Sequence, residues 1–293
     1  IYLYQVFECI VIQMINQPIV RRFPDGLWEF VFPDAIESED VQDKYWEAIE
    51  LLDFDPEKSI SILSDLVKQF PYFIDAYNHL SIANKNVKRG DESFRIAKEA
   101  YEIGRNAFPI EFDHKVHELR WSILDNRQYL RSCHILGLEY QDRKLYGRAI
   151  DLYKDILTKN PGDNQGVRYL ILECYIHQKD FHKGQQFFKL HSDNSIEFSY
   201  GQVLLDIFAG NIVLATENMK YAMKKNKYLP KIVAENGSVI PEEFRLQGEP
   251  NFVPPGVPVG SIHEAYEYWK RNKDIFSSKA VNDFFVKMVI SGR

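Results

Sequence analysis

Three side chains with ligand-binding chemistry share one stripe of a predicted helix. Arg127, Arg131 and His134 are spaced four and three residues apart, so they lie on the same side of a helical turn. Leu136 and Tyr140 have the spacing of a packed face, which leaves the cationic stripe facing away from that contact. Guanidinium groups on such a stripe favour carboxylate ligands, which they bind through paired hydrogen bonds.

Amide side chains accompany this stripe in neighbouring segments. We assign Arg168 to the position equivalent to His134 in the next helix, with Asn164 and Gln165 about one turn earlier. The full candidate set is Asn78, Asn126, Arg127, Arg131, His134, Asn164, Gln165 and Arg168. Together these residues predict a cationic, amide-rich groove suited to a carboxylate or an acidic peptide. The alternative is that Arg127 and Arg168 brace helices through salt bridges, for example to Glu139 or Glu173.

Other chemistries have weaker support in the sequence. Motifs of the types GxSxG, HExxH and GxGxxG, and the phosphate-binding glycine loop, are absent, so no catalytic residue is assigned. His114 and His117 stand three apart on a predicted helix, but no third metal ligand is marked nearby, and we expect ordinary surface histidines. A basic cluster fits either phosphate contacts or a solvated helix end, and we favour the helix end. Its members are Lys220, Lys224, Lys225, Lys227 and Lys231.

Composition limits the class of protein further. The 293 residues are 45% hydrophobic and carry a net charge of −6, which argues against a generic nucleic-acid binder. Cys9, Cys133 and Cys174 are far apart, as expected for buried thiols in a reducing compartment, and we expect a cytoplasmic protein. The apolar run 1–13 is shorter than the roughly 20 residues of a membrane-spanning helix. We expect it to pack as a strand or helix, the alternative being disorder or a membrane-facing segment.

A repeated spacing of small and large residues identifies the elements that position these side chains. Counting five, nine, twelve and seventeen residues on from Lys144 gives Ala149, Tyr153, Ile156 and Pro161. Similar steps recur from Phe54, Lys179 and Gly210, and a looser unit with Phe94, Ala97 and Tyr101 surrounds Gly90. Small residues permit two antiparallel helices to approach closely, while large ones fill the space beside them. The spacing predicts an all-α array of about five helix pairs forming a right-handed superhelix.

The two ends of the chain differ from this array. Residues 17–35 predict a short hairpin or extended arm, and residues 110–127 predict an additional helix before the central unit. Ser261 and Glu264 form a capping box that opens a C-terminal helical cap. We expect the apolar residues of the proline-rich segment 247–260 to pack against the helices. The predicted domains are an N-terminal arm (1–40), a repeat domain (41–230), and a proline-rich segment with capping helices (231–293).

The central segments also resemble a known superfamily. The unit 133–161 matches the tetratricopeptide repeat (TPR) pattern. The elements LDNRxxLR (124–131) and NQGxRY (164–169) are similar to those of bacterial cytosolic TPR proteins of undetermined function. The resemblance implies a repeat fold and gives weight to the polar residues of both elements. Chaperone-binding TPR proteins clamp a carboxylate with Lys and Asn at fixed inner positions. Here Asn78, Ile82, His134 and Leu138 occupy them, so chaperone binding is not predicted.

These observations predict a non-enzymatic interaction scaffold. Its partner would be another protein or a peptide, with an acidic segment as one candidate, and no cofactor, metal or membrane is expected. The alternative is a small-molecule- or metal-dependent enzyme or regulator with its site in the same groove. Nucleic-acid binding through the lysine cluster is a weaker alternative.

Overall fold

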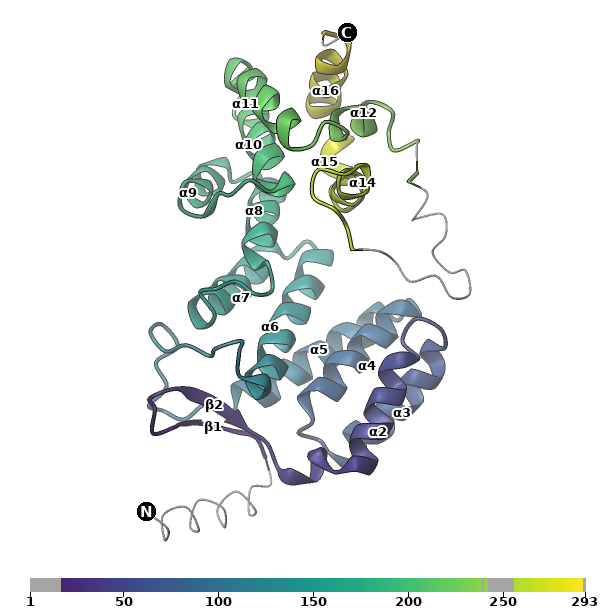
Figure 1. Cartoon of the computed structure of the whole chain (residues 1–293), viewed down its shortest axis with the longest axis vertical. Helices are drawn as coiled ribbons and strands as arrows, with labels where there is room; N and C mark the ends of the chain where they lie inside the picture. The colour runs from purple at the N-terminus through teal and green to yellow at the C-terminus, as the bar shows by residue number, and fades with distance from the viewer. Residues whose placement is uncertain (1–16, 239, 242–255, 292–293) are drawn as a thin grey trace. The chain divides into compact units, whose positions relative to one another are not determined.

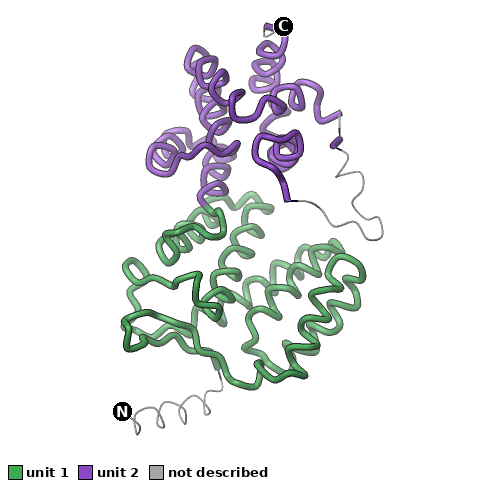
Figure 2. Tube along the Cα trace, viewed as in Figure 1, with its two compact units in different colours: residues 1–167 green, residues 168–293 purple. Residues whose placement is uncertain are grey.

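The computed structural model describes residues 17–238, 240–241 and 256–291. The chain forms two compact units, residues 1–167 and residues 168–293 (Figure 2). Helices dominate both units, and the described residues contain one two-stranded sheet, which lies in the first unit (Figure 1). The predicted all-α repeat fold with a short β arm and a helical C-terminal cap is therefore confirmed. The predicted domain boundaries stay a prediction.

The first unit opens with the predicted hairpin. Its strands β1 (Ile19–Arg22) and β2 (Trp28–Val31) are antiparallel, and the turn between them passes through Gly26 at φ +87°. One face of the hairpin is buried, and the Phe30 ring stacks at 5.4 Å from that of Tyr129. The backbone N–H of Val20 donates to the carbonyl of Ala107 over 2.8 Å. The hairpin is thus tied into the helices of this unit.

Three antiparallel helix pairs follow a short 3-10 helix, η1 (Asp34–Glu37). They are α2 (Glu39–Glu50) with α3 (Pro56–Gln69), α4 (Ile74–Asn86) with α5 (Gly90–Arg105), and α6 (Leu124–Asp142) with α7 (Tyr146–Lys159). The cap expected at Asp55 is present, since its carboxylate accepts from the N–H of Lys58 at 3.1 Å. Gly137 of α6 lies against Tyr153 of α7, as the repeat spacing requires.

A left-handed residue marks the turn inside four of the pairs. Lys88, Lys144, Lys179 and Gly210 have φ between 58° and 77°, and each lies two residues before the second helix. Counting from Lys88 gives Ser93, Ala97 and Ala100, all fully buried. The unit around Gly90 therefore follows the common register, and Phe94 and Tyr101, which are partly buried, pack against the core as expected. Three small residues replace the small-large-small pattern there.

The same register corrects the position of Arg168. Asn78 and His134 each lie ten residues before the left-handed residue of their own pair. The corresponding residue before Lys179 is Tyr169, not Arg168. The error arose because a long loop precedes this helix, so counting forward from the previous unit gives a register shifted by one residue.

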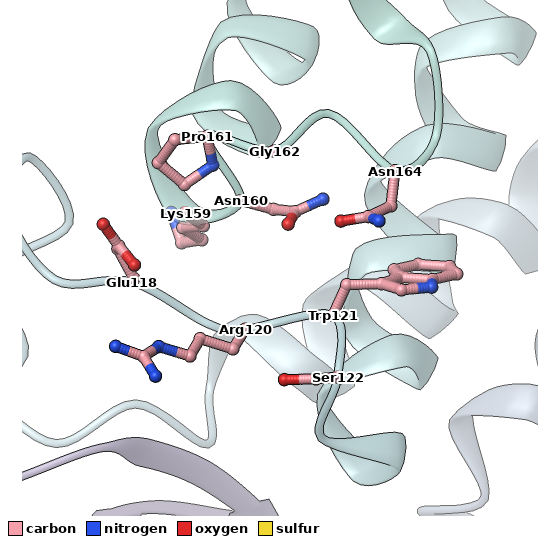
Figure 3. Close-up of a pocket in the computed structure, with 9 residues that line it drawn as sticks. All are labelled: Glu118, Arg120, Trp121, Ser122, Lys159, Asn160, Pro161, Gly162 and Asn164. Atoms are coloured by element: carbon pink, nitrogen blue, oxygen red, sulfur yellow. The ribbon is translucent and has the colours of Figure 1, made fainter.

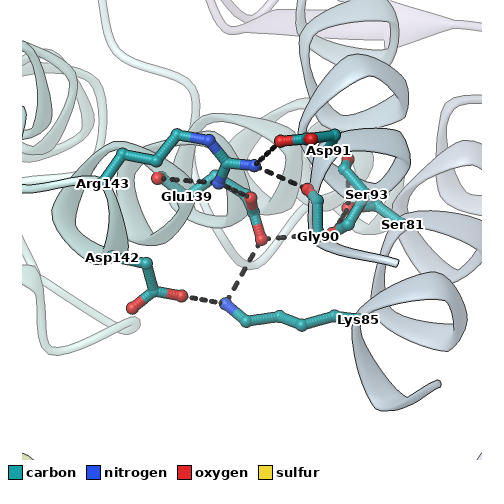
Figure 4. A network of polar contacts seen from close by, with 8 residues as sticks. All are labelled: Ser81, Lys85, Gly90, Asp91, Ser93, Glu139, Asp142 and Arg143. Carbon is teal, nitrogen blue, oxygen red and sulfur yellow. Dashed lines mark hydrogen bonds and ion pairs between the residues drawn. The ribbon is translucent and has the colours of Figure 1, made fainter. Parts of the chain in front are cut away.

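A buried carboxylate joins the second and third helix pairs (Figure 4). Glu139 of α6 is 2% exposed and accepts a hydrogen bond from Ser93 Oγ of α5 at 3.1 Å. Lys85 of α4 lies 3.2 Å from the same carboxylate, and Arg143 forms an ion pair with it. Arg143 also donates to the carbonyl of Gly90 at 2.6 Å. The suggested brace between Arg127 and Glu139 is therefore not formed, because other cations hold Glu139.

The segment between α5 and α6 has no helix where one was expected. Residues 110–123 form turns and extended backbone, in which Phe112 packs its ring edge-on against Trp28 at 5.2 Å. His117 also packs against Trp28, and its Nδ1 accepts from the N–H of Asp113 at 2.9 Å. Aromatic packing beneath the hairpin thus takes the place of helical periodicity in this segment.

The second unit holds two further pairs and the C-terminal helices. The pairs are α8 (Val167–Gln178) with α9 (Phe181–His191), and α10 (Ile196–Phe208) with α11 (Ile212–Lys225). The remaining helices are α12 (Leu229–Ala234), α14 (Ile262–Arg271), α15 (Lys273–Phe276) and α16 (Lys279–Ser291).

The C-terminal helices lie against the first helices of these pairs. Asn272 donates to Glu173 of α8 at 3.1 Å, and Arg271 of α14 pairs with Glu197 of α10 at 2.9 Å. The capping box is present, with Ser261 Oγ accepting from the N–H of Glu264 at 3.1 Å. Glu264 in turn accepts from the N–H of Gly260 at 2.8 Å. Asn272 and Arg271 contact the carboxylate of Glu173, and Arg168 pairs with Asp193 at 2.8 Å.

The predicted packing of the proline-rich segment is wrong where it can be followed. Val257 is 39% exposed and Val259 is 85% exposed. Phe252 and Val253 lie outside the described residues, as does the apolar run 1–13. Among the helices that are described, none has the length and apolar character needed to cross a membrane.

Candidate functional site

The first helices of all three pairs in the first unit line a single cavity. It has a volume of about 420 Å³ and is bounded by η1, α2, α4 and the start of α6. Three aromatic side chains contribute to its wall, Tyr45, Trp46 and Phe73. Trp46 is 57% exposed, so a large ring is available to a ligand at this surface. We call this cavity the inner pocket.

A partly buried ion pair lines the inner pocket. Arg131 Nε of α6 donates to Asp75 Oδ1 of α4 at 2.9 Å, and a second guanidinium nitrogen contacts Oδ2. Asp75 is 6% exposed and also accepts from Asn78 Nδ2 at 3.0 Å. The charge of Arg131 is therefore largely balanced within the protein.

Arg127 occupies a different position on the wall of the inner pocket. Its Nε donates to the carbonyl of Trp121 at 2.7 Å, and its guanidinium lies 5.1 Å from the centre of the Trp121 ring. Through Nε the group is oriented, while its two terminal nitrogens are not engaged by this contact. Arg127 is thus the cation of the pocket that is best placed to meet a ligand.

The inner pocket is mixed in charge and not cationic as predicted. Glu37, Asp75 and Asp125 line it together with Arg127 and Arg131. Burial raises the pKa of Asp125, and burial together with the nearby charge of Asp125 raises the pKa of Glu37. The pocket is less cationic than predicted because the carboxylate of Asp75 pairs with Arg131 and balances its charge.

His79 and Tyr45 complete the polar wall. The His79 Nδ1 atom lies 2.9 Å from the carbonyl of Asp75 and 3.1 Å from Tyr45 Oη. Burial lowers the pKa of His79, so the ring is neutral at neutral pH. The tautomer of His79 decides whether Nδ1 donates to the carbonyl of Asp75 or accepts from the Tyr45 hydroxyl.

The predicted amide residues mostly support the pocket from behind. Asn78 and Asn126 are fully buried. Asn126 accepts from the N–H of Phe30 at 2.9 Å and donates to the carbonyl of Trp28 at 3.1 Å, which fixes the hairpin. Asn78 Nδ2 donates to the carbonyl of Gln128 at 3.0 Å, and neither amide lines the cavity.

The remaining predicted residues are dispersed. Gln165 donates to the carbonyl of Leu130 at 3.1 Å and lies 3.4 Å from His134 Nδ1. Burial lowers the pKa of His134 to about 4. Asn164 is exposed and lines a second cavity. Arg168 belongs to the second unit, where it pairs with Asp193 at 2.8 Å.

The lysine cluster and the candidate metal ligands do not line the inner pocket. In the part of the chain that is described, no group of three or more His, Cys, Asp or Glu side chains has a metal-binding arrangement. Two members of the lysine cluster lie over tyrosine rings, Lys225 over Tyr221 and Lys227 over Tyr228, both at 5.2 Å. The interpretation of the lysine cluster as a solvated helix end stays a prediction.

Comparison with solved structures identifies the fold. A tetratricopeptide repeat protein from Parabacteroides merdae superposes with a TM-score of 0.50, at 14% identity, covering 85% of this chain and 99% of that one. The chain has a tetratricopeptide-like fold. TPR-like repeats of a putative kinesin light chain from Podosopora anserina give a TM-score of 0.47 at 11% identity, covering 68% and 98%. The sequence matches no protein-family model and no curated protein. At these identities the likeness establishes the fold and no activity.

The TPR-like register shows which site residues the sequence analysis missed. Asp75 and Arg131 each lie thirteen residues before the left-handed residue of their own pair, so they are equivalent positions on neighbouring helices. Applying the Lys144 register to Lys88 would have paired them. No spacing signal indicated Tyr45 or Trp46, because the loop between α2 and α3 departs from the common turn.

Proposed function

We propose that this TPR-like protein is an interaction scaffold that holds an extended segment of a partner protein in the inner pocket. The observation that carries the proposal is the cavity of about 420 Å³ lined by the first helices of three consecutive pairs. Repeat proteins bind partners on such surfaces, because each repeat contributes side chains to one continuous face. The predicted groove residues Arg127 and Arg131 line this cavity, and Asn78 supports it by donating to the carboxylate of Asp75.

The lining favours a peptide over a small anion. Exposed Trp46 and oriented Arg127 are the residue types that contribute most to protein interfaces. Glu37 and Asp125 would repel a purely acidic ligand, while Arg127 offers donors to carbonyl or carboxylate oxygens. A segment of mixed polarity with an apolar side chain for Trp46 therefore fits this cavity better than an acidic peptide.

Affinity capture with matched arginine variants tests the proposal. Arg127→Ala should abolish the recovery of a specific partner, whereas Arg95→Ala should leave it unchanged. Arg95 lies on α5 with its side chain 60% exposed, and it pairs with Glu92 and Glu99 away from the pocket. Equal recovery with both variants and with the original protein would show that the inner pocket is not the binding site.

A further inference from the structure

A second cavity of about 460 Å³ lies at the end of α7 (Figure 3). One side is the segment 118–122, which enters a turn at 121, and the other is the turn 159–164 between α7 and α8. The N–H of Leu119 donates to the carbonyl of Lys159 at 2.7 Å, which holds the two sides together. Glu118 and Arg120 contribute one charge of each sign, and the third charged lining residue, Lys159, is paired with Asp155, so the cavity has no strong preference for a charged ligand.

Asn160 is the unusual residue of this cavity. It is 4% exposed, and its side-chain Nδ2 has no hydrogen-bond partner among the described residues. Its backbone is fixed, because its N–H donates to Ile156 at 2.7 Å and its carbonyl accepts from Asp163 at 3.0 Å. A buried amide hydrogen without an acceptor costs about 1–3 kcal/mol, so the site is arranged to receive an acceptor.

A second amide faces the first. In Figure 3 the side chains of Asn160 and Asn164 extend toward each other beside Gly162. A Cβ atom at Gly162 would lie 3.4 Å from Asn164 Oδ1 and 4.0 Å from Asn160 Oδ1. A side-chain amide offers one donor and one acceptor edge, which is the complement of a peptide group. Because Asn164 is exposed, it can move aside to admit a ligand.

The second cavity adjoins the inner pocket through one residue pair. Trp121 lines the second cavity, and Arg127 lines the inner pocket. The two residues are in contact through the 2.7 Å hydrogen bond and the stacked guanidinium. The Trp121–Arg127 contact therefore links the linings of the two cavities.

We propose that this second cavity binds a main-chain amide group of an extended peptide through the side chains of Asn160 and Asn164. The identity of the ligand rests on the proposed scaffold function, but the site is separate from the inner pocket. Binding through the main chain makes the site tolerant of sequence, whereas the aromatic and charged inner pocket selects side chains.

The probe is N-acetyl-triglycine amide, a neutral main-chain ligand, titrated into the full-length protein labelled with ¹⁵N. The side-chain amide signals of Asn160 and Asn164 should shift in a saturable way. Asn160→Asp, which removes the buried donor at constant shape, and Asn164→Ala at an exposed position should each weaken binding about tenfold, the value of one hydrogen bond. Folding of the Asn160→Asp protein is checked by its unchanged backbone spectrum.

Several outcomes would overturn this inference. Absence of a saturable shift up to the solubility of the probe would mean that water alone fills the cavity. A stronger response to N-acetylglycine, which carries a carboxylate, would indicate an oxyanion site. The Arg127→Ala protein should still bind the probe. If the probe binds but partner capture does not depend on Arg127, the proposed function is refuted and the amide site stands. If partner capture depends on Arg127 but the probe does not bind, the amide site is refuted and the proposed function stands.

Discussion

Arg131 of α6 forms an ion pair with Asp75 of α4 through two guanidinium contacts in the lining of the inner pocket. The two residues occupy the same register position on adjacent helices, where opposite charges meet across the inner face. Burial alone would lower the pKa of Arg131, but the hydrogen bonds and charge of Asp75 outweigh it and raise that pKa. The pair therefore serves both to pack the helices and to shape the pocket.

Replacing Arg131 with Met should destabilise the protein. Asp75 would remain 6% exposed without its cation, and a lost hydrogen bond to a buried charged group costs about 1–3 kcal/mol. Arg95→Met, which removes an exposed arginine with two carboxylate partners, should cost about 0–1 kcal/mol. Urea unfolding of both variants at neutral pH measures the difference. Equal changes in the free energy of unfolding would show that the buried pair contributes no more than a surface one.

Asn126→Ala should loosen the β-hairpin from the helices. The change leaves the N–H of Phe30 and the carbonyl of Trp28 without their side-chain partner. Each buried group left unsatisfied costs about 1–3 kcal/mol. Hydrogen exchange at the Phe30 amide should accelerate, while Asn164→Ala at an exposed position should leave it unchanged. Unaltered exchange in the Asn126 variant would mean that strand packing alone holds the hairpin.

Gly137→Ala tests the close approach inside the third helix pair. A Cβ atom there would lie 2.3 Å from Tyr153 Cε1, so the buried ring has to move. Overpacking of this kind costs about 1–3 kcal/mol. Gly90 has no atom within 4 Å of an added Cβ and begins α5, so Gly90→Ala should be neutral or stabilise by up to about 1 kcal/mol. Thermal unfolding should separate the two variants, and a stable Gly137→Ala protein would show that Tyr153 can move aside.

Acidification should destabilise the protein in part through His134. Burial lowers the pKa of this ring from 6.5 to about 4 in the folded state. Between these values the unfolded chain binds the proton more readily, so stability is lost as pH falls from 6.5 toward 4. The loss should reach about 3 kcal/mol at about 1.36 kcal/mol per pKa unit. His134→Gln should reduce the slope of the unfolding free energy in this window; an identical slope would contradict the burial of a neutral ring.

The sequence predicts the repeat fold well because the constraint is local. The positions of Gly137 and Ala149 require small residues because two helices touch there, and the turn through Lys144 sets the spacing of these positions. The unit around Gly90 looks looser in the sequence because small residues, Ser93, Ala97 and Ala100, take all three marked positions. The Ser93 hydroxyl donates to the buried Glu139, a residue 46 positions away, and local spacing does not indicate this contact.

The site is less predictable, since its chemistry depends on distant partners. Arg127 and Arg131 were identified as candidate groove residues, but nothing in their local sequence shows that Asp75 neutralises one of them. In the sequence, Asn126 cannot be told apart from a ligand-binding amide. In the structure its side chain accepts from the N–H of Phe30 in strand β2, 96 residues earlier. Hydrogen bonds over such separations follow from tertiary packing, so the periodicity of the sequence does not indicate them.

A photoreactive side chain in the inner pocket tests the central claim most directly. Benzoyl-phenylalanine at Trp46, which lines the pocket and is 57% exposed, should cross-link one contiguous segment of a partner protein in cells. The same group at Phe54, 83% exposed in the turn between α2 and α3, is the matched control. The account predicts an adduct at position 46 that disappears with Arg127→Ala and is absent at position 54. Identical adducts at both positions, or an adduct at position 46 that persists without Arg127, would contradict it.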